Sequence, residues 1–98
     1  MSQFNFKGSK NKADIIQITK ALGSETRYEI LKLLKEDKMD YSITDLAKSI
    51  GQTEANISSQ VRTLEKVGLV QSSYKAGTHG VLKIVKLNFK ELYIDFLH

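Results

Sequence analysis

The sequence predicts a mainly α-helical domain with one small β-hairpin, an α+β class, in the element order α-α-α-α-β-β-α. Three observations predict it. Apolar residues recur at helical spacing in four segments between residues 12 and 67. After Gly68 the pattern changes to runs rich in valine, isoleucine, leucine and tyrosine, and the apolar residues of 89–97 are helically spaced again. A length of 98 residues fits one domain.

The first two predicted helices follow a polar segment. Residues 1–11 are expected to form a flexible N-terminal arm, so that the folded domain spans residues 12–98. The first helix ends before Gly23, which suits a helix C-terminus. Ser24 is a fair N-cap for the second helix, whose pattern stops near Asp37. The apolar side of the first helix is formed by Ile15, Ile18 and Leu22.

The third and fourth predicted helices are joined by a very short link. Ser42 with Asp45 three residues later is close to a capping box, which starts the third helix, and Gly51 ends it. Thr53 caps the fourth helix, which runs to about Val67. Two short helices linked this closely indicate a helix-turn-helix.

The rest of the chain is predicted to form a hairpin and a last helix. Residues 69–88 are rich in strand-forming residues and are divided by AGTHG, which predicts two strands joined by a glycine-containing loop. A hairpin placed after a helix-turn-helix indicates a winged helix-turn-helix. The apolar face of the last helix would be formed by Phe89, Leu92, Tyr93, Phe96 and Leu97.

The composition argues against most kinds of chemical site. The chain has no cysteine, which excludes disulfides, thiolate metal sites and cysteine nucleophiles. It has no glycine-rich phosphate loop, and neither His79 nor His98 has a nearby nucleophile with a group to orient it. Asp95 and His98 are spaced like two metal ligands, but a site needs about four, and a solvated tail is the preferred interpretation. We expect no catalytic residue, metal or cofactor.

The net charge of +4 comes from an excess of lysine at the two ends of the chain. A basic domain suggests a polyanionic partner such as nucleic acid or an anionic membrane surface, although many lysine-rich proteins bind neither. No apolar run approaches the ~18 residues of a membrane span, and the first residues lack the apolar core of a signal peptide. We therefore expect a cytoplasmic protein with no membrane partner.

The fourth helix carries an uncharged polar stripe. Asn56, Ser59, Gln60 and Thr63 recur at i, i+3, i+4 and i+7 and so share one face. The second helix of a helix-turn-helix can lie in the major groove. There the amides of asparagine and glutamine pair with adenine, and the hydroxyls of serine and threonine hydrogen-bond to donors or acceptors on the base edges. The alternative is the polar face of a surface helix, with no role in binding. Glu54 is assigned to stabilising the N-terminus of its own helix. The expected base-reading residues are Gln52, Thr53, Asn56, Ser59 and Gln60.

Contacts with the DNA backbone are expected from the same helix and from the hairpin. A basic loop beside a helix-turn-helix can touch flanking phosphates or the minor groove, and the alternative is an exposed polar turn. The expected residues are Ser58, Arg62, Thr63, Lys75, Thr78, His79 and Lys83.

The first and last helices have more apolar surface than one small core is expected to absorb. Exposed apolar patches usually mark an interface, and two-fold pairing would place two recognition helices about one DNA turn apart. The alternative is that both helices close the core of the monomer. The expected dimer interface comprises Ile15, Ile18, Leu22, Phe89, Leu92, Tyr93, Phe96 and Leu97.

Two segments resemble the ArsR-type winged-helix regulators. ALGSETRYEILKLL is similar to that family's ALG.PTR..IL..L signature, and ITDLAKSIGQTEANISSQVRTLEKVGLV is similar to its recognition segment. The resemblance covers roughly residues 20–88 and implies a homodimeric DNA-binding repressor that dimerises through its first and last helices. It places KAGTHG in the wing. It places on the DNA-facing side of the recognition helix Thr53, Ala55, Asn56, Ser59 and Gln60.

Two departures from the family pattern bear on regulation. Glu25 stands where the family usually has proline, and the helix spelt ITDLAKSI lacks the cysteines of metal-sensing members. The resemblance therefore does not imply metal sensing, and any small-molecule inducer is unknown.

The sequence thus predicts a homodimeric regulator of transcription that binds specific sequences of double-stranded DNA and acts as a repressor. The recognition helix over residues 53–67 would lie in the major groove, and the wing over residues 75–80 on the flanking backbone. The alternative is a winged-helix module that docks on transcription machinery, with the uncharged stripe as a protein contact. RNA binding is less expected because the sequence offers no platform of exposed aromatic residues.

Overall fold

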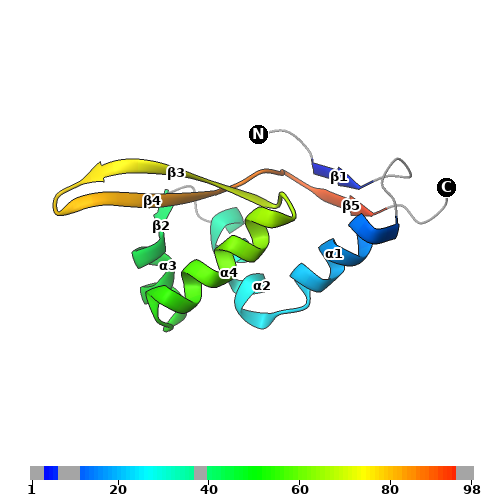
Figure 1. Cartoon of the computed structure of the whole chain (residues 1–98), viewed down its shortest axis with the longest axis horizontal. Helices are drawn as coiled ribbons and strands as arrows, with labels where there is room; N and C mark the ends of the chain where they lie inside the picture. The colour runs from blue at the N-terminus through cyan, green and yellow to red at the C-terminus, as the bar shows by residue number, and fades with distance from the viewer. Residues whose placement is uncertain (1–3, 7–11, 37–39, 95–98) are drawn as a thin grey trace.

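The computed structural model describes residues 4–6, 12–36 and 40–94. It confirms a mainly helical fold with a hairpin that projects past the helices (Figure 1). The elements in chain order are β1 (Phe4–Phe6), α1 (Lys12–Leu22), α2 (Glu25–Glu36), β2 (Tyr41–Ser42), α3 (Ile43–Ile50), α4 (Glu54–Lys66), β3 (Val70–Gly77), β4 (Gly80–Leu87) and β5 (Leu92–Ile94).

The ends of α3 and α4 follow the predicted capping signals. The hydroxyl of Ser42 accepts from the backbone N–H of Asp45 at 3.0 Å, and the Asp45 carboxylate accepts from the N–H of Ser42 at 3.2 Å, which completes a capping box. Gly51 ends α3 with a φ of 80°, a conformation that favours glycine. Thr53 then caps α4 by accepting from the N–H of Asn56 at 3.1 Å. The predicted helix-turn-helix is confirmed.

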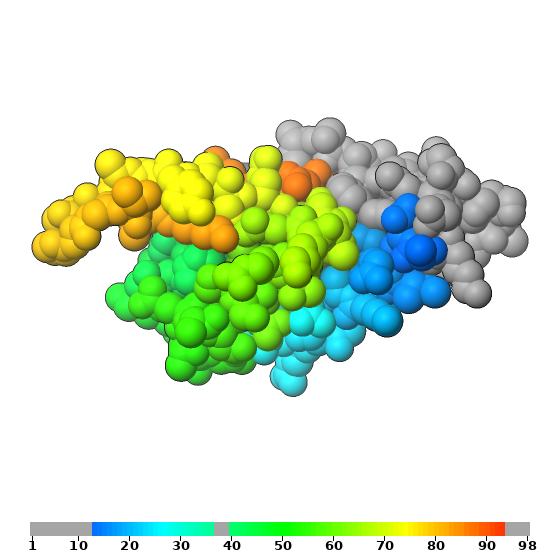
Figure 2. All heavy atoms as spheres, viewed as in Figure 1, coloured from blue at the N-terminus to red at the C-terminus, as the bar shows by residue number. Residues whose placement is uncertain are grey.

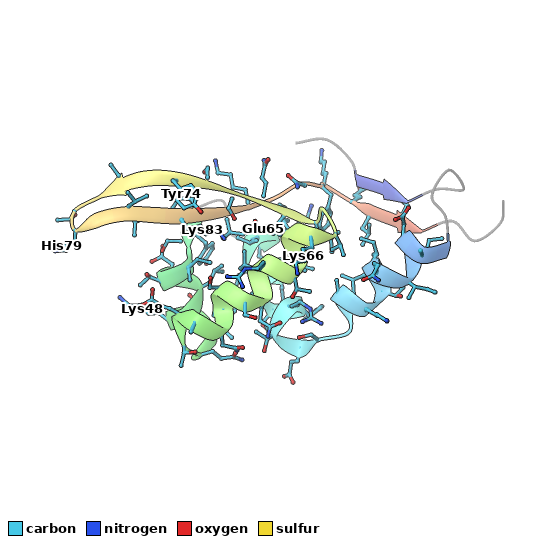
Figure 3. The ribbon with its side chains drawn as sticks, viewed as in Figure 1. Lys48, Glu65, Lys66, Tyr74, His79 and Lys83 are labelled. Carbon is cyan, nitrogen blue, oxygen red and sulfur yellow. The ribbon has the colours of Figure 1, made fainter. Side chains whose placement is uncertain are left out.

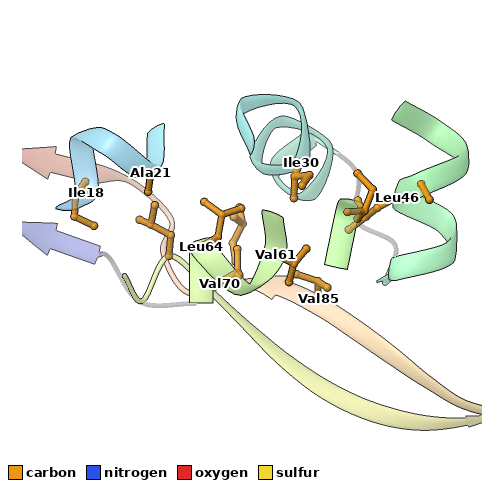
Figure 4. Close-up of a cluster of buried hydrophobic side chains, with 12 residues drawn as sticks. Ile18, Ala21, Ile30, Leu46, Val61, Leu64, Val70 and Val85 are labelled. Carbon is orange, nitrogen blue, oxygen red and sulfur yellow. The ribbon is translucent and has the colours of Figure 1, made fainter. Parts of the chain in front are cut away.

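The core extends along the inner side of α4, from α1 to α3 (Figure 4). Three α4 residues, Ile57, Val61 and Leu64, have no exposed surface. Their i, i+4, i+7 spacing is the period that predicts an amphipathic helix. Burying each such side chain contributes about 1.5–3 kcal/mol, so this row holds α4 against the rest of the domain.

A three-stranded antiparallel sheet in the order β2-β4-β3 covers one side of the helices. Gly77 pairs with Gly80 at the end of the hairpin, so Thr78 and His79 form its two-residue tip. The predicted hairpin is confirmed, but β2 was not predicted. Two residues, Tyr41 and Ser42, are too few to give a strand period.

The predicted helix over residues 89–97 is wrong for its described part. Residues 92–94 form β5, which pairs in parallel with β1. Leu92 is half-buried and Tyr93 exposed, an alternation typical of a strand. The carbonyl oxygen of Lys90, which a helix would use internally, accepts from Lys35 Nζ at 2.8 Å. Phe96 and Leu97 lie outside the described residues.

The pairing with β5 also corrects the expected N-terminal arm. Residues 4–6 form β1 rather than a loose segment, and the rest of the arm lies outside the described residues. The short apolar run Leu92–Ile94 fits a strand as well as a helix, and the strand partner lies at the other end of the chain.

The expected dimer residues divide into two groups. Ile18 is only 1% exposed and belongs to the core of its own chain, so its assignment to an interface is wrong. Leu22, Phe89 and Leu92 also pack against that core while retaining some exposure. Ile15 is half-buried, and Tyr93 is 49% exposed. Four of the six described residues therefore pack at least partly against the core of their own chain.

Candidate nucleic-acid interface

The outward side of α4 is open along most of the helix. It lies opposite the buried row and presents four exposed residues at i, i+4, i+7 and i+11 spacing. In the space-filling view α4 crosses the front of the molecule below the hairpin (Figure 2). We call these residues the outward row: Ala55, Ser59, Arg62 and Lys66.

The predicted polar stripe is rotated from this outward row towards α2. Of its four residues Ser59 is exposed, whereas Asn56, Gln60 and Thr63 are half-buried. The Thr63 hydroxyl donates to the carbonyl oxygen of Ser59 at 3.3 Å, so this proton is used within the helix. The stripe therefore has one open edge and one edge in contact with its own domain.

The amides on the α2 side form a continuous hydrogen-bonded chain, which we call the amide ladder: Gln52, Asn56 and Gln60. Gln60 Nε2 donates to Asn56 Oδ1 at 3.2 Å, and Asn56 Nδ2 donates to Gln52 Oε1. At one end Gln52 Nε2 donates to Thr26 Oγ1 at 2.9 Å. At the other end Arg27 Nη1 donates to Gln60 Oε1 at 2.7 Å. Three predicted base-reading residues are thus brought together, anchored to α2 at both ends.

The two carboxylates of α4 are both held within the domain. Glu54 Oε1 accepts from the Thr44 hydroxyl of α3 at 2.8 Å, so its contact reaches beyond its own helix. Glu65 lies on the hairpin side, where its Oε1 is 2.9 Å from Lys83 Nζ and accepts from the Ser72 hydroxyl at 2.8 Å. Figure 3 shows Glu65 and Lys83 side by side between α4 and the hairpin. None of the residues in the outward row is acidic.

The surroundings of Glu65 favour its ionised form. Burial raises the pKa of Glu65, but the hydrogen bonds from Lys83 and Ser72 more than offset it and lower the pKa below its ordinary value. The charges of Lys83 and Arg62 act in the same direction. Lys83, expected to contact phosphate, is instead paired with Glu65, because the hairpin register turns it towards α4.

The other hairpin residues are available at the surface. Lys75, Thr78 and His79 are exposed, with His79 at the tip (Figure 3). Tyr74 is 72% exposed and lies opposite Lys83 in the register. Ser58 of α4, also expected at phosphates, is half-buried.

Sequence reasoning missed three basic residues around α4. Lys48 of α3 and Lys66 of α4 are exposed, and Lys48 lines a hollow of about 440 Å³ at the helix-turn-helix link with Gln52 and Thr53. Arg27 anchors the amide ladder. Exposed lysines on charged helix faces carry no sequence signal of their own, and the role of Arg27 depends on how three helices meet.

In the ranges that the structure describes, no group of three or more histidine, cysteine or acidic residues could hold a metal ion. Asp95 and His98 lie outside those ranges. No helix in the described part of the chain is long and apolar enough to cross a membrane.

The family model for the bacterial regulatory proteins of the arsR family matches residues 24–72, which extend from the start of α2 into β3. The chain belongs to the ArsR family. The match includes the helix-turn-helix, the amide ladder and both ends of the outward row. No curated protein matches the chain.

Solved structures share the fold of this ArsR-family chain. Reduced HlyU from Vibrio cholerae has a TM-score of 0.65 at 24% identity, covering 81% of this chain and 77% of HlyU. A homodimeric winged helix-turn-helix DNA-binding domain from Mycobacterium bovis, a possible ArsR-family regulator, has a TM-score of 0.65 at 20% identity, covering 82% of this chain and 74% of that domain. A possible transcriptional regulator from Methanosarcina mazei has a TM-score of 0.59 at 20% identity, covering 85% of this chain and 72% of that regulator. These likenesses show a winged helix-turn-helix fold.

Proposed function

We propose that this ArsR-family chain binds specific sequences of double-stranded DNA as a homodimer and represses transcription. In this proposal α4 lies in the major groove, and the β3–β4 hairpin lies on the flanking backbone. The observation that carries it is the distribution of charge on α4. The outward row is neutral or basic, while Glu54 and Glu65 are bound within the domain. A helix that enters a groove lined by phosphates benefits from having no acidic residue in the row that it presents to them.

The proposed base contacts come from the N-terminal part of α4. Ser59 is exposed, and each amide of the ladder retains one N–H and one oxygen lone pair beyond its ladder bonds. One donor beside one acceptor is the pattern with which asparagine and glutamine bind adenine. Thr53 lies beside them, at the N-cap. The proposed base-reading residues remain Gln52, Thr53, Asn56, Ser59 and Gln60.

The proposed phosphate contacts differ from the initial set. Lys83 is left out because it binds Glu65, and Thr63 because its hydroxyl donates to its own helix. Lys48 and Lys66 are added because both are exposed, Lys48 near Gln52 and Thr53 and Lys66 at the C-terminal end of the outward row. The proposed set is Lys48, Ser58, Arg62, Lys66, Lys75, Thr78 and His79.

The proposed dimer uses the outer side of α1 with the neighbouring β5. Ile16 is 39% exposed and Tyr93 is 49% exposed, and Ile15 lies beside Ile16. Two-fold pairing of this surface would place two α4 helices on one face of a duplex, about one turn apart. The fold neighbour from Mycobacterium bovis is described as a homodimeric DNA-binding domain.

Selection from a random duplex pool, followed by salt titration on the enriched sequence, tests the proposal. We expect an inverted repeat whose half-sites lie about 10 base pairs apart, centre to centre. We also expect affinity to fall steeply with salt, because phosphate contacts release counterions. A pool that yields no motif, with weak or salt-insensitive binding, would contradict the proposal and favour a protein-interaction module.

A further inference from the structure

We propose that Arg27 is a specificity-determining positioning residue. It lies in the first turn of α2 and donates a hydrogen bond to Gln60, at one end of the ladder. It would fix which way round the three amides of the ladder face, and therefore which pattern of donors and acceptors α4 presents to DNA. This inference rests on the proposed function for its consequence at DNA, but its structural part can be tested on the free protein.

The guanidinium of Arg27 is held by the end of α1. Its Nε donates to the carbonyl oxygen of Ala21 at 2.7 Å, and Nη2 donates to that of Lys20 at 3.2 Å. These carbonyl groups belong to the last turn of α1, where carbonyl groups lack partners within the helix; that of Lys20 also accepts from the backbone N–H of Gly23 at 3.1 Å. Two bonds from one planar fork fix its orientation. Nη1 is thereby directed at Gln60.

Arginine determines the direction of the ladder because it can only donate. An amide can turn over and exchange its oxygen with its nitrogen, but Gln60 must direct its oxygen at Arg27. The Gln60 nitrogen then faces Asn56, which must accept through Oδ1. The same requirement passes from Asn56 to Gln52, whose nitrogen donates to the hydroxyl of Thr26. That hydroxyl can accept or donate, so the choice is made at the Arg27 end.

The direction of the ladder matters for base recognition. A bidentate contact with adenine needs an acceptor for its N6 amino group and a donor for its N7, each in the right place. If an amide turns over, its donor and acceptor exchange places, and the contact becomes a mismatch. Losing one such contact reduces discrimination about tenfold. Arg27 would therefore affect sequence preference without touching a base.

The first part of the test uses NMR of the free protein and two substitutions. Arg27→Gln replaces a donor with a group that donates or accepts, whereas Arg27→Lys keeps a donor-only group. Lys32→Gln removes one charge from an exposed site on the same helix and serves as the control. In the wild-type chain and in R27K, the Gln60 Nε2 protons should show NOEs to Asn56 rather than to residue 27.

In R27Q the side-chain amide resonances of Gln60 and Asn56 should shift or double, while those of K32Q should match the wild-type chain. Unchanged amide resonances and NOEs in R27Q would overturn the proposed role of Arg27. Should R27Q fail to fold, R27K still tests the proposed role of Arg27. NOEs in R27K from the Gln60 Nε2 protons to residue 27 rather than to Asn56 would equally overturn that role. This part needs no DNA.

The second part measures the affinity of each variant for the enriched motif and for a scrambled duplex. R27Q should lose about tenfold in the ratio of the two affinities, whereas R27K and K32Q should stay within about twofold of the wild-type ratio. An equal loss on both duplexes in R27Q would overturn the specificity role. A wild-type chain that enriches no motif would refute the proposed function and the consequence of Arg27 for DNA specificity. The NMR result would still show whether Arg27 fixes the orientation of the ladder amides.

Discussion

On the side of α4 that faces α2, three uncharged amides form a ladder anchored by Arg27, whereas on the side that faces the hairpin Glu65 binds Lys83 and Ser72. The amides keep donors and acceptors that can still bind a partner. The carboxylate on the other side is directed at its own domain. In the proposed function, one side of α4 serves recognition, while the other side orients the hairpin.

Both sides depend on the buried row of α4, and its disruption should give the largest effect. Ile57 is fully buried, and Ile57→Ala removes apolar contacts and leaves a cavity. We expect a loss of about 2–5 kcal/mol in the free energy of unfolding. Chemical denaturation measures it, with Val81→Ala at a 71% exposed position as the control. A similar, small loss in both variants would contradict the packing described for α4.

Removing an amide from the ladder should affect recognition rather than folding. Asn56→Ala would lose the proposed base contact and weaken binding to the enriched duplex by about 1–3 kcal/mol. Binding to a scrambled duplex should change little. Fluorescence anisotropy with both duplexes measures the two affinities, and Gln60→Ala should behave in the same way. Equal weakening on both duplexes would contradict base reading by the ladder.

The outward row should respond differently. Arg62→Ala removes a proposed phosphate contact, so every duplex should bind more weakly and the slope of log affinity against log salt should fall by about 1. Salt titrations of the variant and the wild-type chain on a scrambled duplex check this. A loss confined to the enriched duplex would instead make Arg62 a base-reading residue.

Breaking the pair of Glu65 with Lys83 on the hairpin side should have the smallest effect on stability, and this effect should depend on pH. Lys83 and Glu65 have side chains that are 23% and 32% exposed, so their partly screened pair is expected to contribute at most about 1 kcal/mol. The folded-state pKa of Glu65 is lowered, so this contribution is present above the unfolded pKa of about 4.3 and is lost as the pH falls through the lower folded value.

Denaturation of the wild-type chain and Glu65→Gln at neutral and acid pH tests this sign. The stability difference between the two proteins should shrink as the pH falls below about 4, because the wild-type carboxylate becomes protonated. A difference that stays constant or grows towards acid pH would contradict the ionised state assigned to Glu65.

The parts of the fold that the sequence predicts well are set by local signals. Ser42, Gly51 and Thr53 lie within a few residues of the helix ends that they define. The buried row of α4 follows from a period that is visible in one segment. The helix-turn-helix formed by α3 and α4 could therefore be predicted before any contact between helices was known.

The parts that could not be predicted depend on contacts between distant segments. The parallel pairing of β1 with β5 joins Phe4 to Leu92, and neither segment indicates the other. The pair of Lys83 with Glu65 depends on the hairpin register against α4. Asn56 and Gln60 of the ladder were predicted from their spacing along α4, but the anchor of the ladder, Arg27, is 33 positions from Gln60 in the sequence.

The most direct test of the central claim, that α4 reads bases, compares two duplexes of equal length and composition at several salt concentrations. One carries the selected motif and the other is scrambled. We predict that the wild-type chain binds the motif at least a thousandfold more tightly and that Asn56→Ala reduces this ratio about tenfold. Equal affinity of the wild-type chain for both duplexes across the salt range would contradict the claim.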